Sequence, residues 1–499
     1  MRKVRAILTL VVAGCLAACQ SGTESQADES IEPATYAVPR ISGSYTSYQG
    51  TELGGVTVDY TSAVLYPDSS GSEILLQWDD VTGDEFDEGA HFRLTLASDL
   101  RTFQKFYVFT AENQLIDSID LSLGTPFQPV QCKIPLIYVS EVLSNGLKVR
   151  LKGPGVPVEV FTRTALNLDN FLPHLLIPGE QPVRKAFLDK MASTACLTEY
   201  GWQEGCVLDG IALLADRAMD GSRYQQNLEK HLSLIFPDND SVNHNYEQLS
   251  IEFTSCLAQL ARHHPEHPEI EHVLAFWECK TDTTGMVKDG NTLVAEANYT
   301  VSWPLAVMSE QLNRPELAEE AIRQLRFRQK YLVDEEGAIW LRYNLGSQVR
   351  TFPLWSRGLT WYFLGLAKTL DALPDPPQDL IEELQRAAKY LMALQRDDGM
   401  WTVFANDNRT APETSGTSGI ATALAIGVRR GWLGEDAEKS ARRALEGVEK
   451  RLTADGFLQG VAEENKGGIA FQRQTKGSMC HWGMGLYAQL LAELAPPEK

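Results

Sequence analysis

The sequence predicts a multidomain β + α protein, in which an N-terminal β-sandwich precedes an (α/α)6-type toroid of helical hairpins. Short segments with alternating apolar residues fill the first third of the chain. From about residue 182 onward, apolar residues recur at every third and fourth position, which is typical of helices. A turn that contains an acidic residue and a glycine, here called the acidic-Gly step, also recurs there about every fifty to sixty residues. We therefore expect the β-sandwich over residues 46–170 and the toroid over residues 182–499.

The first residues predict export. A basic start is followed by an apolar run over residues 6–18, which is too short to cross a bilayer, and then by Cys19. Residues 16–19, Leu-Ala-Ala-Cys, resemble the lipobox of bacterial lipoproteins. We predict a lipoprotein signal peptide over residues 1–18, lipidation of Cys19, and a lipid-anchored location in the bacterial cell envelope, periplasmic or at the outer membrane. The alternative is an ordinary signal peptide cleaved elsewhere.

Residues 19–45 are rich in Ser, Glu, Gly, Thr and Pro, and we expect a flexible tether there. The predicted strands of the next region cover residues 56–60, 73–78, 92–96, 106–109, 147–151 and 158–161, with turn residues between them. Many short strands at such spacing favour a β-sandwich. Residues 172–181 contain prolines and a glycine, and we expect a linker.

The helical repeat is marked by Gly285, Gly337, Gly399 and Gly456. One helical hairpin fits each interval, so the region holds about five or six hairpins. An open solenoid is the alternative, but its terminal repeats should be polar caps, whereas residues 482–494 are strongly apolar. The pattern therefore favours a closed ring whose inner helix ends form a cup.

The composition excludes some partners. A net charge of -21 argues against nucleic acid, and a polyanionic fragment would have to enter a locally basic pocket. No Cys/His grouping has zinc spacing, and no metal or organic cofactor is expected. Cys196 with Cys206, or Cys256 with Cys279, are candidates for disulfides, with buried free thiols as the alternative. The oligomeric state is left open.

Residues 352–367 carry the clearest functional signal. Pro353 suits the first turn of a helix, and Arg357 and Trp361 are four residues apart, so they share a helix face. With Trp355 they predict a pocket for an acidic sugar, because indole rings stack on a pyranose and a guanidinium binds a carboxylate. The helix N-terminus also favours an anion. The alternative is a buried arginine satisfied by a structural carboxylate, with the tryptophans in the core.

Four segments together resemble glycoside hydrolase families 88 and 105, the unsaturated uronyl hydrolases. These are residues 202–210, residues 355–358 with Trp361, residues 394–401 followed by 413–417, and residues 427–433. The resemblance covers most of residues 182–494 and not the β domain. It implies that the substrate is a product of a polysaccharide lyase, an acidic oligosaccharide that ends in a 4,5-unsaturated uronic acid. An acidic side chain protonates the enol ether, water adds, and the resulting hemiketal opens and releases the neighbouring sugar.

The resemblance also implies the site residues. The family places two aspartates on successive inner helices, and at these places the present chain has Glu252, with Glu247 behind it, and Glu296. We predict Glu296 and Glu252 as catalytic, with a pKa raised by desolvation; a structural ion pair is the alternative for Glu296. The predicted substrate-binding residues are Trp355, Arg357, Trp361, Tyr246, Asn298, Tyr299, Glu413, His481 and Trp482.

Other functions stay open at this point. One is a saturated β-glucuronidase or a polysaccharide lyase of toroid fold. A lyase would create the conjugated double bond that an unsaturated uronyl hydrolase consumes. Another is a non-catalytic, lipid-anchored glycan-binding protein that kept the cup of the toroid and lost the family's acids.

Overall fold

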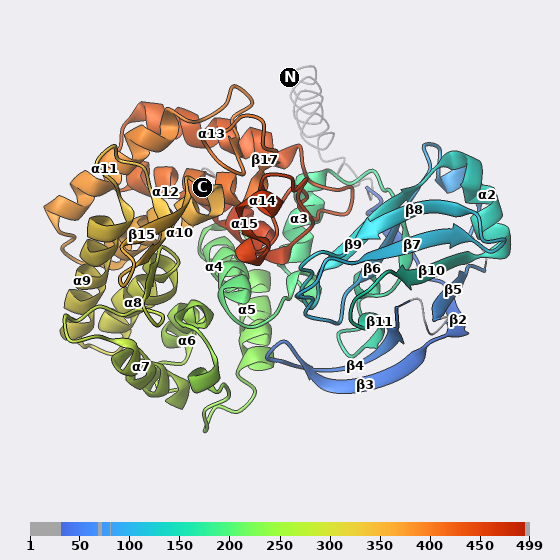
Figure 1. The fold of residues 1–499 in the computed structure, drawn as a ribbon, viewed down its shortest axis with the longest axis horizontal. Helices are drawn as coiled ribbons and strands as arrows, with labels where there is room; N and C mark the ends of the chain where they lie inside the picture. The colour runs from blue at the N-terminus through green and yellow to red at the C-terminus, as the bar shows by residue number, and fades with distance from the viewer. Residues whose placement is uncertain (1–30, 68–71, 80, 495–499) are drawn as a thin grey trace, which may run out of the picture.

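The computed structural model describes residues 31–67, 72–79 and 81–494. It confirms the expected β + α architecture: a domain of antiparallel sheets lies beside a ring of helices (Figure 1). The predicted signal peptide and Cys19 lie outside the described residues. In the described part of the chain, no helix combines the length and the apolar character needed to cross a bilayer.

In the described residues, the β domain contains three antiparallel sheets around one apolar core. The sheets have the strand orders β1-β12-β6-β9, β2-β5-β10-β7-β8 and β11-β4-β3, and buried residues of all three belong to the same cluster. All six predicted strands are present. The strand bounds are β1 (Thr35–Ala37), β2 (Arg40–Ser44), β3 (Thr46–Leu53), β4 (Val56–Leu65), β5 (Glu73–Gln77), β6 (Ala90–Thr95), β7 (Lys105–Thr110), β8 (Leu115–Asp120), β9 (Pro129–Ile134), β10 (Leu147–Lys152), β11 (Val158–Thr164) and β12 (His174–Ile177), with helix α2 (Leu136–Asn145) between β9 and β10.

Two sequence expectations about the edges of this domain are wrong. Strands β1 and β2 lie inside the segment expected to be a tether, residues 19–45, where β1 pairs with β12 and β2 pairs with β5. Strand β12 lies inside the expected linker, residues 172–181, and also pairs with β6. Strands of three to five residues are too short to show a clear period of two. The folded domain therefore extends beyond residues 46–170 on both sides.

The helical domain is a closed ring of two layers. The described inner helices are α4 (Trp202–Arg217), α6 (Leu257–His263), α8 (Trp303–Gln311), α10 (Ser356–Ala372), α12 (Thr414–Arg429) and α15 (His481–Leu494). The helices outside them are α3 (Val183–Met191), α5 (Gly221–Ile235), α7 (Pro268–Lys280), α9 (Pro315–Leu332), α11 (Gln378–Met392) and α13 (Glu435–Glu449). Each inner helix packs against the next, and α15 packs against α4. The toroid is confirmed, and the open solenoid is wrong.

Ring closure depends on a very close approach between the first and last inner helices. A Cβ atom at Gly485 would lie 2.3 Å from the backbone oxygen of Cys206, and one at Gly210 would lie 2.6 Å from the backbone oxygen of Gly485. A larger residue at either position would push α4 and α15 apart. Close helix contact therefore explains these two glycines.

The acidic-Gly repeat occurs where the chain leaves an outer helix. Gly285, Gly337, Gly399 and Gly456 all have positive φ, between 82° and 87°. This left-handed conformation favours glycine, so the chain can turn sharply and run back to the next inner helix. In the second unit, the Asp334 carboxylate accepts hydrogen bonds from the backbone N–H groups of residues 336 and 338.

A buried ion pair joins the two domains. The Arg93 guanidinium on β6 donates to the Asp455 carboxylate at 2.7 Å, and both side chains are almost fully buried. Asp455 belongs to the last acidic-Gly turn of the toroid, and its carboxylate also accepts a hydrogen bond from the Tyr36 hydroxyl on β1 at 2.8 Å. Arg93 and Lys190 hold the pKa of Asp455 well below its usual range, although burial opposes them. The β domain is therefore fixed against the ring.

Shorter elements complete the mouth of the ring. A small sheet of β13 (Thr292–Val294), β14 (Trp340–Asn344) and β15 (Val349–Pro353) lies beside α10, and a two-stranded sheet joins β16 (Trp401–Thr402) and β17 (Pro412–Glu413). Helices η8 (Asn465–Gly467) and α14 (Gly468–Gln472) precede α15. All six cysteines from Cys132 to Cys480 are free thiols, so neither candidate disulfide forms.

Candidate active site

A cavity of about 280 Å³ opens where several inner helices begin. Trp202 begins α4, Trp355 caps α10, and Glu252 and Glu296 precede α6 and α8. Helix N-termini carry partial positive charge, so this end of the ring favours an anionic group. The cavity is lined by Arg101, Glu199, Trp202, Gln203, Ser250, Glu252, Phe253, Asp289, Glu296, Arg342, Trp355, Arg357, Trp361, Glu464, Asn465 and Lys466.

The structure brings together five of the predicted site residues in this cavity: Trp355, Arg357, Trp361, Glu252 and Glu296. The Arg357 guanidinium lies 4.6 Å from the centre of the Trp355 ring. On the other side, the ring of Trp361 lies 5.5 Å from a third indole, that of Trp202. The cavity therefore offers indole surfaces and a guanidinium to one small ligand, an arrangement suited to a sugar that carries a carboxylate.

Arg357 also forms hydrogen bonds within the fold, which its sequence pattern does not predict. Its guanidinium donates hydrogen bonds to the backbone oxygens of Ala462 and Glu463, the latter at 2.6 Å. These partners are backbone carbonyls, so the alternative of a structural carboxylate partner does not describe the site. Arg357 thus anchors residues 462–463, and only its remaining N–H groups are left for a ligand.

The two predicted acids are presented by irregular backbone rather than by regular helix. Glu252 lies on the 3₁₀ turn η6 (Ile251–Thr254), whose first residue follows a Ser250 cap. Glu296 lies between β13 and η7 (Asn298–Ser302), a π-helical turn that leads into α8. Such π turns are rare in proteins, and those that occur are often found at functional sites. Glu296 is only 4 % exposed, and its Oε2 atom has no hydrogen-bond partner among the described residues.

The environment of Glu296 raises the pKa of its carboxyl group. Burial and the neighbouring charge of Glu252 raise the pKa of Glu296 to about 8, although Arg342 and Arg357 oppose the shift. Burial also raises the pKa of Glu252, with Arg342 again opposing. Among the described residues, Glu296 forms no structural ion pair. With its raised pKa it can donate a proton near neutral pH.

Another wall of the cavity consists of residues that our sequence analysis did not assign to the site. Gln203 donates hydrogen bonds to Glu199 at 2.6 Å and to Glu464 at 3.1 Å. Lys466 and Arg101 lie 2.5 Å and 3.5 Å from the Glu464 carboxylate. Burial raises the pKa of Glu464 to about 7, while Arg101 and Arg357 lower it. This wall adds hydrogen-bonding groups and a second carboxyl pair.

Arg342 is the other unassigned cation. It projects from β14 into the cavity, donates to the Asn465 side chain at 2.9 Å, and forms no ion pair with any described residue. The sequence offered a reason to assign Trp202 to the site, because it begins residues 202–210, which resemble the first inner helix of families 88 and 105. No sequence pattern assigned Arg342 or Arg101 to the site, because Arg342 lies on a short strand and Arg101 lies in the β domain.

Three predicted binding residues lie behind the cavity rather than in its lining. Tyr246 is fully buried, and its hydroxyl is hydrogen-bonded to that of Tyr200. The Tyr299 hydroxyl donates to Asp209 at 2.6 Å. The Asn298 side chain donates to the backbone oxygen of Tyr362 at 3.0 Å. These partners give all three side chains packing roles within the helical domain.

The other three predicted binding residues also lie outside the lining. Glu413 caps α12, where its carboxylate accepts hydrogen bonds from the backbone N–H groups of residues 415, 416 and 462. His481 is buried against Phe457, and desolvation lowers its pKa to about 3. Trp482 packs on Trp202 with ring centres 5.1 Å apart, so it supports the aromatic wall from behind.

Comparisons with known proteins identify the family of the helical domain. Residues 183–496 match Glycosyl Hydrolase Family 88. A curated relative from Alteromonas sp. (strain LOR), named unsaturated 3S-rhamnoglycuronyl hydrolase, is 28 % identical over 182 residues, which are 34 % of this chain and 44 % of the relative. The alignment thus spans less than half of that relative's length.

Solved structures share the fold of the helical domain. A family 105 glycoside hydrolase from C. acetobutylicum has a TM-score of 0.55 at 19 % identity, over 63 % of this chain and 99 % of its own. A family 88 glycosyl hydrolase from Bacteroides vulgatus has a TM-score of 0.51 at 20 % identity, also over 63 % of this chain and 99 % of its own. The family match covers the whole ring that carries the cavity, and the chain therefore belongs to Glycosyl Hydrolase Family 88.

Proposed function

We propose that this protein removes a terminal 4,5-unsaturated uronic acid from the oligosaccharides that polysaccharide lyases release. The observation that carries the proposal is the buried Glu296 carboxyl group, whose pKa is raised, in a cavity walled by tryptophans and arginines. The family membership and the name of the Alteromonas relative support the same reaction class. No step in this chemistry requires a cofactor.

In this proposal, Glu296 donates its proton to the double bond of the enol ether, water adds to the activated ring, and the proton that the water releases returns to the Glu296 carboxylate. The hemiketal that results opens and releases the neighbouring sugar. Glu252 keeps the pKa of Glu296 high by its charge, so that the proton is available at neutral pH. Arg342 has no ion-pair partner among the described residues and is the cation that meets the uronate carboxylate, while the indoles of Trp355 and Trp361 contact the ring.

The direct test follows the ultraviolet absorbance of unsaturated oligosaccharides. The panel should contain lyase products of pectin, ulvan and glycosaminoglycans, and the unsaturated rhamnoglycuronyl substrates implied by the relative's name. We expect the absorbance of at least one substrate to fall. If no substrate changes, the proposal is wrong, and a rise in absorbance with intact polysaccharide would indicate a lyase instead.

The Glu296→Gln variant separates an enzyme from a glycan-binding protein. We expect its kcat to fall by roughly 10²–10⁴, because general acid catalysis contributes about this factor. Substrate binding, measured by calorimetry, should be retained, since the amide keeps the shape of the protonated carboxyl group. Glu413→Gln is not a matched control because that carboxylate caps α12; Glu247→Gln is one, since Glu247 is exposed and outside the cavity lining.

We also propose that the protein is anchored in the bacterial envelope through a lipid on Cys19, where it would meet the oligosaccharides released outside the cytoplasm. The basis is the sequence pattern of residues 1–19. Metabolic labelling with an alkyne-tagged fatty acid should mark the full chain and the Cys15→Ser control but not the Cys19→Ser variant. Equal labelling of the Cys19→Ser variant would contradict the proposal.

A further inference from the structure

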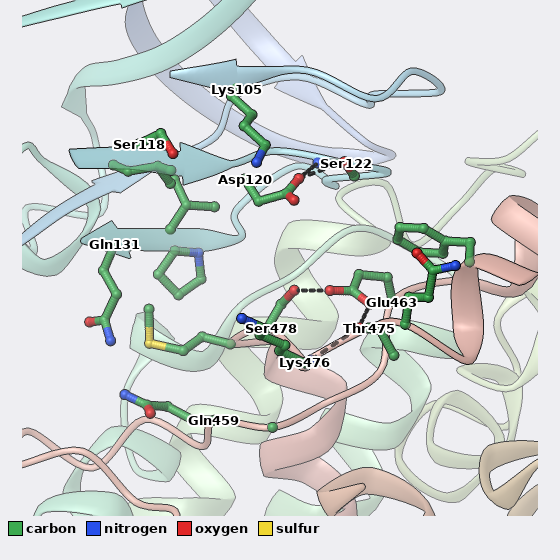
Figure 2. A pocket seen from close by; sticks show the side chains of 18 of the residues that line it. Lys105, Ser118, Asp120, Ser122, Gln131, Gln459, Glu463, Thr475, Lys476 and Ser478 are labelled. Atoms are coloured by element: carbon green, nitrogen blue, oxygen red, sulfur yellow. Dashed lines mark hydrogen bonds between the residues drawn. The ribbon is translucent and has the colours of Figure 1, made fainter. Parts of the chain in front are cut away.

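A second cavity, of about 700 Å³, lies between the β domain and the helical ring. Figure 2 shows side chains from both sides that approach one hollow. One side is supplied by β7, β8 and β9, and the other by the segment that leads to α15, mainly residues 459–479. The β-domain side belongs to a part of the chain that the family match, residues 183–496, does not cover.

Three exposed cations line this cavity. Lys105, Arg451 and Lys476 are exposed, and within the described part of the chain none of them forms an ion pair or a side-chain hydrogen bond. Unpaired cations around one hollow are notable in a chain with a net charge of -21, because the surrounding surface repels anions. The cavity is therefore a place where an anion gains contacts.

The carboxylates of the same cavity are held by hydroxyl groups. The Asp120 carboxylate accepts hydrogen bonds from the backbone N–H and the hydroxyl of Ser122, at 2.9 and 2.5 Å. The Glu463 carboxylate accepts hydrogen bonds from the hydroxyls of Thr475 and Ser478, the latter at 2.6 Å, as the dashed lines in Figure 2 mark. Neither acid forms an ion pair with the three cations, although Lys105 lies opposite Asp120 in the pairing of β7 with β8, so the cations keep their N–H groups for a ligand.

The remaining lining suits a sugar. Ser118, Gln131 and Gln474 add hydroxyl and amide groups that can hydrogen-bond to sugar hydroxyls, and Phe471 adds an apolar ring. The Phe471 ring is fixed by an edge contact with Phe103 of the β domain, with ring centres 5.2 Å apart. Polar groups beside an apolar ring match the two kinds of surface that a pyranose presents.

The second cavity and the candidate active cavity share one wall. The Glu463 carboxylate faces the second cavity, its backbone oxygen accepts a hydrogen bond from Arg357, and the next residue, Glu464, lines the active cavity. A glycan held in the second cavity would thus contact the segment that Arg357 anchors beside the reacting sugar.

We propose that this interdomain cavity is a second glycan-binding site, which binds an oligosaccharide through its carboxylate or sulfate groups. The β domain is then part of a glycan-binding surface as well as a support for the ring. The proposal rests on the proposed function only for the class of ligand.

The test uses saturated hexasaccharides, which carry no double bond and cannot be turned over. One probe carries carboxylates, one carries sulfates, and a neutral glucose hexasaccharide is the reference. Calorimetry compares the wild type with a triple variant, Lys105→Gln, Arg451→Gln and Lys476→Gln. The matched control replaces three exposed lysines on outer helices, Lys230, Lys330 and Lys389, by Gln, and so removes the same charge elsewhere.

We expect the wild type and the control variant to bind at least one acidic probe, more weakly at higher salt, and the triple variant to bind it about tenfold more weakly or worse. Preference between the carboxylated and sulfated probes identifies the acidic group. Equal binding by the triple variant, equal binding of the neutral probe, or no binding of either acidic probe would overturn the proposal.

Turnover of an unsaturated disaccharide keeps this test separate from the proposed function. The triple variant should turn over the disaccharide at the wild-type rate, which also shows that it is folded. If no variant and no wild-type protein turns over any unsaturated substrate, the proposed function fails, and the hexasaccharide binding still decides the second site.

Discussion

The guanidinium of Arg101 lies 3.5 Å from the carboxylate of Glu464, so the β domain supplies part of the wall of a cavity that otherwise belongs to the helical ring. Arg101 also forms an ion pair with Asp99 in the same loop. The ring alone therefore does not present the complete cavity.

Replacing Arg101 by Gln should raise KM for an unsaturated disaccharide by about three- to tenfold, with little change in kcat. The reason is that Arg101 holds the Glu464 wall, whereas the Glu252–Glu296 pair is untouched. Loss of the cation should also raise the pKa of Glu464 above about 7. Arg40→Gln, which breaks an exposed ion pair with Asp79 in the same domain, is the control and should leave KM unchanged. A loss of kcat with unchanged KM in Arg101→Gln would contradict this account.

Asp455→Asn should destabilise the protein by about 3–5 kcal/mol, because it leaves the Arg93 guanidinium buried without a counter-charge. The measurement is the free energy of unfolding in urea. Asp379→Asn, which removes the partner of Arg326 in a half-exposed pair, should cost less than about 1 kcal/mol. Equal effects of the two substitutions would show that the Arg93–Asp455 pair does not stabilise the domain interface.

The same pair predicts how stability depends on acid. The folded-state pKa of Asp455 lies below its unfolded value, so its contribution is complete above the unfolded pKa of about 4 and is lost as the pH falls through the folded pKa. The difference in unfolding free energy between the wild type and Asp455→Asn should therefore be constant from pH 8 to about pH 5. A difference that already disappears at pH 6 would contradict the assignment.

The contribution of Glu296 to stability should change with pH in the opposite direction to that of Asp455. Its folded-state pKa of about 8 exceeds the unfolded value, so the folded protein loses stability as the pH rises from about 4 toward 8. Glu296→Gln cannot ionise and should be more stable than the wild type at pH 9, by about 5 kcal/mol if the full shift is expressed, with a smaller gain at pH 5. Thermal melts at the two pH values provide the comparison. A variant that is less stable at pH 9 than the wild type would contradict the buried, proton-bearing state of Glu296.

The sequence predicted the ring and most of the strands because their signals are long and periodic. The four acidic-Gly steps recur once per hairpin and occupy the left-handed conformation that requires glycine. Strand β1, in contrast, has three residues and lies in a stretch with the composition of a linker, so its pairing with β12 depends on a partner far away in the sequence. Local patterns do not encode such a partner.

The same contrast between local patterns and distant partners explains which residues of the candidate site the sequence predicted. Trp355, Arg357 and Trp361 lie at the start of one helix, so their spacing alone places them together, whereas Glu296 followed from the resemblance to glycoside hydrolase families 88 and 105. Arg101 comes from the other domain, and its approach to Glu464 bridges 363 residues of sequence. Other predicted substrate-binding residues, such as Tyr246 and Glu413, carry side chains suited to sugar binding, but they form buried hydrogen bonds within the fold instead.

The most direct test of the catalytic role of Glu296 is the pH dependence of kcat/KM for an unsaturated disaccharide in the wild type, Glu252→Gln and Arg342→Gln. In the wild type, activity should fall as the pH rises through about 8, because the acid loses its proton. Glu252→Gln removes a negative neighbour and should move this limb to lower pH, whereas Arg342→Gln removes a positive neighbour and should move it to higher pH. An alkaline limb that stays in place in both variants would contradict the claim that the Glu296 proton drives the reaction.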